Sequence, residues 1–220
     1  MGEILANYDI VGAFWLTIQL AVLSAIGALF LGTVVAVLRV SPVPVMRALG
    51  TLYVNTIRNT PLTLLMVFSI LGLTYILGLQ ISDDAKTNAF WWAVIMLSVY
   101  HATYVCEALR SGVNTIPPGQ AEAARSIGLT FGQSLTQVLL PQAFRGSIAP
   151  LGSAIIALIK NTTVAAMIGV MEAAGLMAVI VENETGSLGV FFIFAVAFLI
   201  MTFPLGLLAT WLSERYMVKR

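Results

Sequence analysis

Charged residues are scarce in this chain of 220 residues: Asp, Glu, Lys and Arg make up 10% of it, whereas 59% is hydrophobic. A soluble domain carries about 25% charged residues, so this composition cannot cover a surface that faces water. The net charge of +1 excludes a protein that binds nucleic acid through bulk positive charge. The composition therefore indicates an integral membrane protein.

Cysteine and histidine are almost missing, since Cys106 and His101 are the single residues of their kinds. One cysteine excludes an internal disulfide and a site of several thiolates, and one histidine leaves no partner for a catalytic dyad. We therefore expect no metal, no catalytic residue and no directly bound cofactor. The Gly-x-x-x-x-Gly-Lys-Ser/Thr phosphate loop is also missing, so any ATP must be hydrolysed by another subunit.

Long apolar runs fill most of the chain. A helix needs about 20 apolar residues to cross the hydrocarbon core, and five segments reach that length. They are predicted at about 12–38, 60–81, 88–109, 148–171 and 187–212. The sequence therefore predicts an all-α integral membrane protein with five transmembrane helices in a single domain over residues 1–220.

Basic residues gather on one side of these spans. Cytoplasmic loops of membrane proteins are enriched in Lys and Arg, which places the N-terminus outside and the C-terminus in the cytoplasm. Lys86 is the single basic residue on the outer side. The nine assigned to the cytoplasmic side are Arg39, Arg47, Arg58, Arg110, Arg125, Arg145, Arg215, Lys219 and Arg220.

The stretch between the third and fourth spans is too long for a simple turn. Pro117 and Pro118 end one helix, and residues 120–125 are strong helix formers that begin another. Gly128 permits a tight bend, and a second amphipathic stretch is predicted over residues 130–140, closed by Pro141. Two short helices at the membrane surface suit docking into a groove of a partner protein, although an ordinary elbow between spans has the same appearance.

This stretch resembles a known family. Glu122-Ala123-Ala124, Gly128 and Leu140-Pro141 match the EAA loop of type I ABC-importer permeases. Three further segments resemble the polar amino-acid uptake group of that family, particularly its actinobacterial glutamate-type permeases. These segments are Arg58 to Leu62, Glu107 to Gln120 and Lys160 to Gly169.

The resemblance implies a type-1 transmembrane domain over about 11–213, with the EAA loop at 117–145. It implies a non-catalytic permease of the bacterial plasma membrane that imports a polar amino acid, with glutamate favoured. Glutamine, aspartate, a basic amino acid or an opine remains an alternative substrate, and an ATP-independent channel or scaffold is the alternative class. The implied partners are an ABC ATPase dimer that uses ATP and Mg, a second, non-identical permease, and an extracytoplasmic solute-binding protein. The residues expected to couple to the ATPase are Glu122, Ala123, Ala124, Gly128, Leu140 and Pro141.

Lys160 is the outstanding charge because it falls near the middle of the fourth span, where a lysine costs about 2.5–3.5 kcal/mol. We expect it either to meet the carboxylate of a substrate or to form a structural ion pair with Glu107 or a neighbouring subunit. The polar residues that follow Lys160 are expected to unwind the helix locally. The candidate residues of a substrate pathway are Lys160, Asn161, Thr162, Asn59, Thr60, His101 and Tyr104.

Three further expectations concern single side chains. Glu107 and Arg110 are spaced i, i+3 and are expected to pair along one helix face. Arg58 is expected to lie at the membrane interface at the start of the second span, with a contact at a gate as the alternative. His101 is expected either to pack in a polar cluster between helices or to line a cavity.

Overall fold

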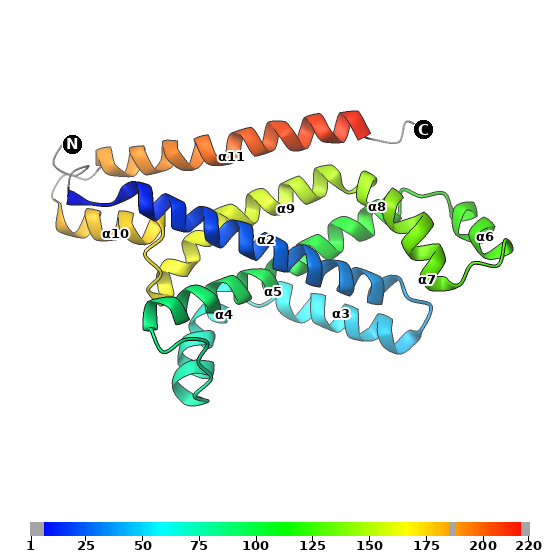
Figure 1. Cartoon of the computed structure of the whole chain (residues 1–220), viewed down its shortest axis with the longest axis horizontal. Helices are drawn as coiled ribbons and strands as arrows, with labels where there is room; N and C mark the ends of the chain where they lie inside the picture. The colour runs from blue at the N-terminus through cyan, green and yellow to red at the C-terminus, as the bar shows by residue number, and fades with distance from the viewer. Residues whose placement is uncertain (1–6, 185–187, 217–220) are drawn as a thin grey trace.

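The computed structural model describes residues 7–184 and 188–216, and within these ranges it contains helices and no β-strand (Figure 1). The all-α fold class predicted from the sequence is confirmed. The helices are, in chain order, α2 (Ile10–Val40), α3 (Pro44–Arg58), α4 (Leu62–Phe68), η1 (Ser69–Ile76), α5 (Ala85–Val113), α6 (Pro118–Ser126), α7 (Phe131–Gln133), η2 (Ser134–Leu139), α8 (Leu140–Gly146), α9 (Ile148–Asn161), η3 (Thr162–Ile168), α10 (Ala173–Asn183) and α11 (Leu188–Tyr216).

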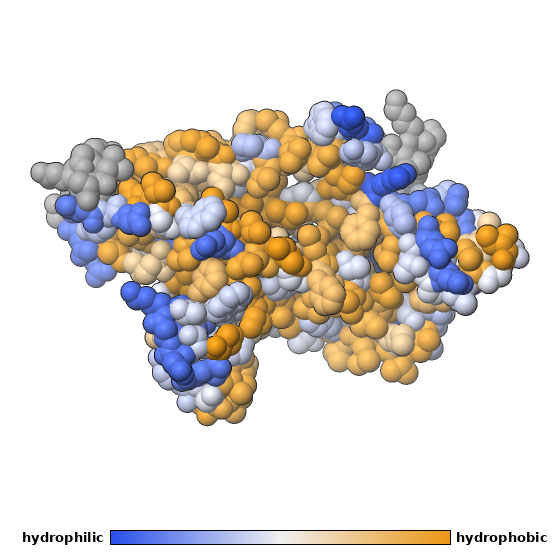
Figure 2. Space-filling view, in the orientation of Figure 1, coloured by the Kyte–Doolittle hydropathy of each residue, from blue (hydrophilic) through white to orange (hydrophobic). Residues whose placement is uncertain are grey.

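Four helical segments are long and apolar enough to cross a membrane, namely α2, α5, α9 continued by η3, and α11. A fifth candidate is the pair formed by α3 and the continuous helix of α4 and η1, which is bent by 93°. Hydrophilic residues gather at the end of the molecule that carries α6–α8, and apolar residues dominate its middle (Figure 2). The molecule therefore has the surface of a multi-pass membrane protein.

The second span differs from its prediction. A single helix was expected over 60–81 after a short link, whereas the link is the 15-residue helix α3 and the apolar helix after it runs only from Leu62 to Ile76. Pro61 explains the break, because proline has no backbone N–H and disfavours helical geometry in the residue before it. The bend sends α4 and η1 away from the long axis of the molecule (Figure 1).

The long helices α2 and α5 pack closely because α2 presents small residues to α5. Small residues let two membrane helices approach without a gap, and those buried along α2 include Ala21, Ser24, Ala28, Gly32 and Ala36. A Cβ at Gly32 would lie 2.6 Å from the Cβ of Val105. The same atom would lie 2.8 Å from the carbonyl oxygen of Ala102. This contact leaves no room for a side chain.

Gly32→Ala is therefore expected to separate α2 from α5 and to destabilise the protein by about 1–3 kcal/mol, the usual cost of overpacking a core. The check is the thermal midpoint of the detergent-purified protein. Gly206→Ala of α11 is the control, because its added Cβ would lie 3.7 Å from Cδ1 of Ile156, an ordinary van der Waals distance. Equal midpoints for Gly32→Ala and the unaltered protein would contradict the tight contact.

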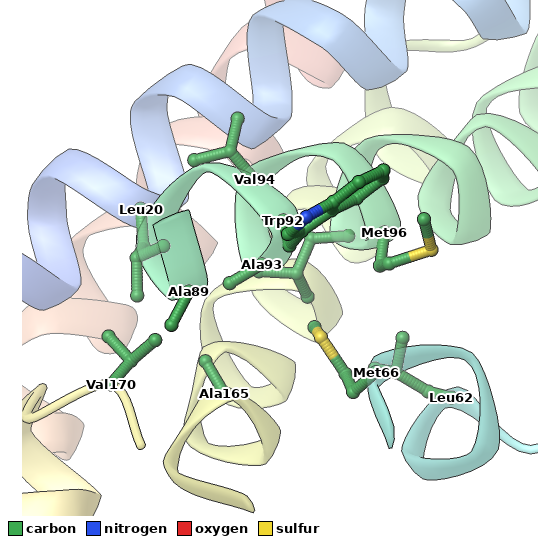
Figure 3. Close-up of a cluster of buried hydrophobic side chains, with 11 residues drawn as sticks. Leu20, Leu62, Met66, Ala89, Trp92, Ala93, Val94, Met96, Ala165 and Val170 are labelled. Carbon is green, nitrogen blue, oxygen red and sulfur yellow. The ribbon is translucent and has the colours of Figure 1, made fainter. Parts of the chain in front are cut away.

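A buried cluster holds the bent span to the bundle. Trp92 of α5, Met66 of α4, Ala165 of η3 and Leu20 of α2 belong to this one cluster (Figure 3). Asn88 ties down the chain after η1, since its Oδ1 accepts a hydrogen bond from the Ile81 N–H at 2.9 Å. These contacts connect elements that are distant in the sequence and position α5 centrally.

Candidate functional site

Polar side chains meet in the middle of the helix bundle. His101 and Tyr104 project from α5, and Asn161 ends α9. His101 lies 12 residues before the end of α5, and Asn161 lies 13 residues after the start of α9. At 1.5 Å per residue these offsets are about 18 Å and 20 Å, so both residues lie midway along their spans. With Arg58 and Tyr100, these three residues form what we call the central polar cluster.

His101 is the buried centre of this cluster. Its side chain is 1% exposed, and its Nε2 lies 3.0 Å from Nδ2 of Asn161. The rings of Tyr100 and Tyr104 flank it, with centroids 5.5 Å and 5.4 Å from that of the imidazole. His101 therefore packs in a polar cluster between α5 and α9, and its place along a substrate pathway stays a prediction.

Arg58 is exposed at the end of α3 and contacts the rest of the central polar cluster. Its guanidinium carbon lies 5.5 Å from the ring centroid of Tyr104, within the range of a cation–π contact. The reason is α3, which carries the chain inward alongside α2 and α5 before Arg58 is reached. The sequence signals of this helix are Pro44 at its first position and the buried pair Gly50 and Val54, spaced i, i+4.

Lys160 is exposed in the last turn of α9. No carboxylate within residues 7–184 and 188–216 forms an ion pair with it. The expected alternative of a pair with Glu107 is wrong, because Glu107 is engaged elsewhere. The helix also does not unwind after Lys160: it tightens into the 3₁₀ turns of η3, in which Thr162 donates to the carbonyl oxygen of Ile159 at 2.7 Å.

Two candidate pathway residues, Asn59 and Thr60, turn their side chains back to their own helix. Asn59 Nδ2 donates to the carbonyl oxygen of Asn55 at 2.7 Å, and the Thr60 hydroxyl donates to the carbonyl oxygen of Thr56 at 2.8 Å. They complete the end of α3. The structure thus brings His101, Tyr104 and Asn161 together, but not these two side chains.

Glu107 is held by two arginines. Arg110 donates through Nε and Nη2 to its Oε2 at 3.0 Å and 2.9 Å, and Arg39 of α2 pairs with its Oε1. The side chains of Arg39 and Glu107 are only 14% and 24% exposed. Sequence spacing indicated the Arg110 contact, whereas Arg39 lies 68 residues away and its contact needs the α2–α5 pairing. This three-residue ion cluster joins two spans.

The EAA loop forms a compact helical unit at one end of the molecule (Figure 1). Ala124 of α6 is buried, whereas Glu122 and Ala123 are exposed. The chain then turns at Gly128, whose φ of 87° is a conformation that other residues rarely adopt. The expected two helices joined at a glycine are present.

Pro141 does not close this unit as expected. It lies in the first turn of α8, where its missing N–H costs little, and the helical path continues to Gly146. The break falls instead at Ser147, just before α9 begins at Ile148. The EAA loop is therefore connected directly to the helix that carries Lys160.

Glu172 is a fully buried carboxylate just before α10. Its Oε1 accepts from the Gly175 N–H at 3.0 Å, which caps α10, and its Oε2 accepts from the Thr17 hydroxyl at 3.3 Å. Burial raises the pKa of Glu172, and these hydrogen bonds oppose the rise. Its neighbours Met171 and Ala173 give no sign in the sequence that Glu172 is buried. The one available signal is its position as the N-cap residue before an apolar helix.

Comparison with known proteins identifies the family. Residues 9–218 match the family described as the inner membrane component of binding-protein-dependent transport systems. The glutamate transport system permease protein GluC of Corynebacterium glutamicum is 50% identical over 214 residues, which are 94% of this chain and 94% of that protein. The probable glutamine ABC transporter permease protein GlnM of Bacillus subtilis is 33% identical over 205 residues, 92% of this chain and 90% of the relative.

A solved structure agrees with this assignment. The crystal structure of an amino acid ABC transporter with histidines superposes with a TM-score of 0.80 at 25% identity, covering 94% of this chain and 93% of its own. The apolar spans, the EAA loop and these relatives lead to one conclusion: the chain belongs to the family of inner membrane components of binding-protein-dependent transport systems, as a multi-pass permease of the ABC importers.

Proposed function

We propose that this permease imports glutamate across the bacterial plasma membrane, driven by ATP that a separate subunit hydrolyses. The observation that carries the proposal is the 50% identity, over 94% of the chain, to a permease named for glutamate transport. The chemistry of the bundle supports an anionic substrate, because Lys160 and Arg58 are exposed cations at the level of the central polar cluster. Glutamine is the second candidate, supported by the 33% identity to GlnM.

The pathway requires a second permease subunit. Lys160 is exposed on the surface of a single chain, and a lysine in the middle of a membrane needs water or a partner around it. Pairing with another permease would enclose this face around a central passage. We propose a non-identical homologue in that position and a solute-binding protein on the outer side.

The ATPase dimer would dock on the EAA loop. Glu122 and Ala123 are exposed on α6, and Ala124 fixes that helix to the rest of the unit. Because α8 leads into α9 after one residue, a displacement of the EAA loop would be transmitted to Lys160 along a helix. ATP and Mg would bind to the ATPase, and this chain would hold neither.

The experiment is uptake of labelled glutamate by cells that carry or lack this permease, with unlabelled amino acids as competitors. Uptake should depend on the permease and should be suppressed most by glutamate. Stronger competition by glutamine than by glutamate would indicate that glutamine is the transported amino acid. Equal glutamate uptake in both strains, with the permease verified in the membrane, would contradict it.

The orientation can be tested with single cysteines in a Cys106→Ser background. We expect Asp83→Cys to react with an impermeant thiol reagent in intact cells, and Gln137→Cys to react only after the membrane is opened. Both positions are exposed, and neither side chain makes a hydrogen bond to another described residue. Labelling of Gln137→Cys alone in intact cells would invert the proposed topology.

A further inference from the structure

We infer that His101 is a positioning residue: it holds the Asn161 amide so that the amide oxygen accepts a hydrogen bond from the α-ammonium group of the substrate. This inference rests on the proposed amino-acid transport. Two neighbouring residues would then bind the two charged groups of an amino acid. Lys160 would contact the α-carboxylate, and Asn161 would contact the α-ammonium group. His101 itself does not touch the substrate.

The direction of one hydrogen bond carries the argument. Nδ2 of Asn161 lies 3.0 Å from Nε2 of His101. With Nδ2 of Asn161 as the donor, Nε2 accepts, and this contact requires the tautomer of His101 that carries its proton on Nδ1. The amide oxygen is bonded to the same carbon and takes no part in this contact. No donor within the described residues lies within hydrogen-bond distance of that oxygen.

Asn161 is the one hydrogen-bond partner of the His101 ring among the described residues. The Nδ1 of the ring is buried and has no partner among the described residues. A buried donor without a partner costs about 1–3 kcal/mol. For packing against Tyr100 and Tyr104 alone, an apolar ring such as phenylalanine would therefore be more stable than histidine. The contact that a phenyl ring could not replace is the one with Asn161.

The position of Asn161 connects this contact to the pathway. It follows Lys160 directly and is half-buried, with one side against α5. A cation and a free carbonyl oxygen on consecutive residues match the carboxylate and ammonium of an α-amino acid. If the amide rotated by a half turn, it would present a donor to the ammonium. Fixing its orientation is therefore the contribution of His101.

The test measures equilibrium binding of labelled L-glutamate to the purified permease–ATPase assembly in nanodiscs, without the solute-binding protein. Glutarate, which has both carboxylates of glutamate but no ammonium, is the competitor. His101→Phe should weaken glutamate binding about tenfold, the value of one hydrogen bond to a charged group, and leave glutarate binding unchanged. His101→Gln can present its amide oxygen to Asn161 but can also present its NH2 group, so it should recover only part of the lost glutamate binding.

Thr103→Val is the matched control, because Thr103 is buried two residues away and donates only within α5, to the carbonyl oxygen of Tyr100. It should bind both compounds as the unaltered protein does. The inference is overturned if His101→Phe leaves glutamate binding unchanged, or weakens glutamate and glutarate equally. Lys160→Met should weaken both compounds, and its failure to do so would also overturn the inference. No glutamate binding by the unaltered assembly would instead contradict the proposed function.

Discussion

Glu107→Gln is expected to leave little folded permease in the membrane. The substitution removes the carboxylate that neutralises Arg39, whose side chain is 14% exposed between two spans. Breaking a fully buried ion pair from one side costs about 3–5 kcal/mol because the other charge stays unpaired, and this half-buried pair is expected to lose about 3 kcal/mol. That loss is a large share of the stability of an ordinary domain. The measurement is the yield and thermal midpoint of the purified protein.

Removing both charges should recover part of this loss. Arg39→Met together with Glu107→Gln leaves no unpaired, half-buried Arg39 beside an amide, so the double variant should be more stable than Glu107→Gln alone. Lys160→Met is the matched comparison, since Lys160 makes no ion pair with Glu107. Rescue by Lys160→Met and none by Arg39→Met would contradict the ion cluster.

Glu122→Lys is expected to abolish ATP-driven uptake, by at least about tenfold, while the protein stays in the membrane. Its side chain is exposed on α6 and forms no ion pair with another described residue, so no packing is lost. A reversed charge at an interface costs several kcal/mol when it meets a complementary surface. The measurements are substrate-stimulated ATP hydrolysis and uptake in the reconstituted assembly.

Gln120→Lys is the control for this prediction. It introduces the same cation on the same exposed helix, two residues away. We expect the control to reduce uptake much less than Glu122→Lys. Normal uptake and ATP hydrolysis by Glu122→Lys would show that Glu122 does not couple the permease to its ATPase.

The apolar spans were predictable because their length alone determines them. The observed starts of α5 and α9, at Ala85 and Ile148, lie within three residues of the predicted positions. The same reasoning failed at α3, where Arg47 and Arg58 interrupt the apolar pattern. An amphipathic helix packed against two others is stabilised by burial of one face, which average hydrophobicity does not show.

The candidate site was predictable in its residue types but not in its partners. His101, Tyr104 and Asn161 stood out as polar groups in apolar segments, and the structure brings them together. The contacts of Arg39 with Glu107 and of Thr17 with Glu172 join residues 68 and 155 positions apart. Such contacts depend on helix pairing, which no local pattern in the sequence encodes.

The most direct test is glutamate uptake into proteoliposomes that contain the permease assembly, with ATP and Mg inside and the glutamate-loaded binding protein outside. We expect glutamate to accumulate above its external concentration with ATP, and not with a non-hydrolysable analogue. Glu122→Lys should abolish the accumulation. Entry that stops at the external concentration and is equal with and without ATP would identify a passive channel and contradict the account.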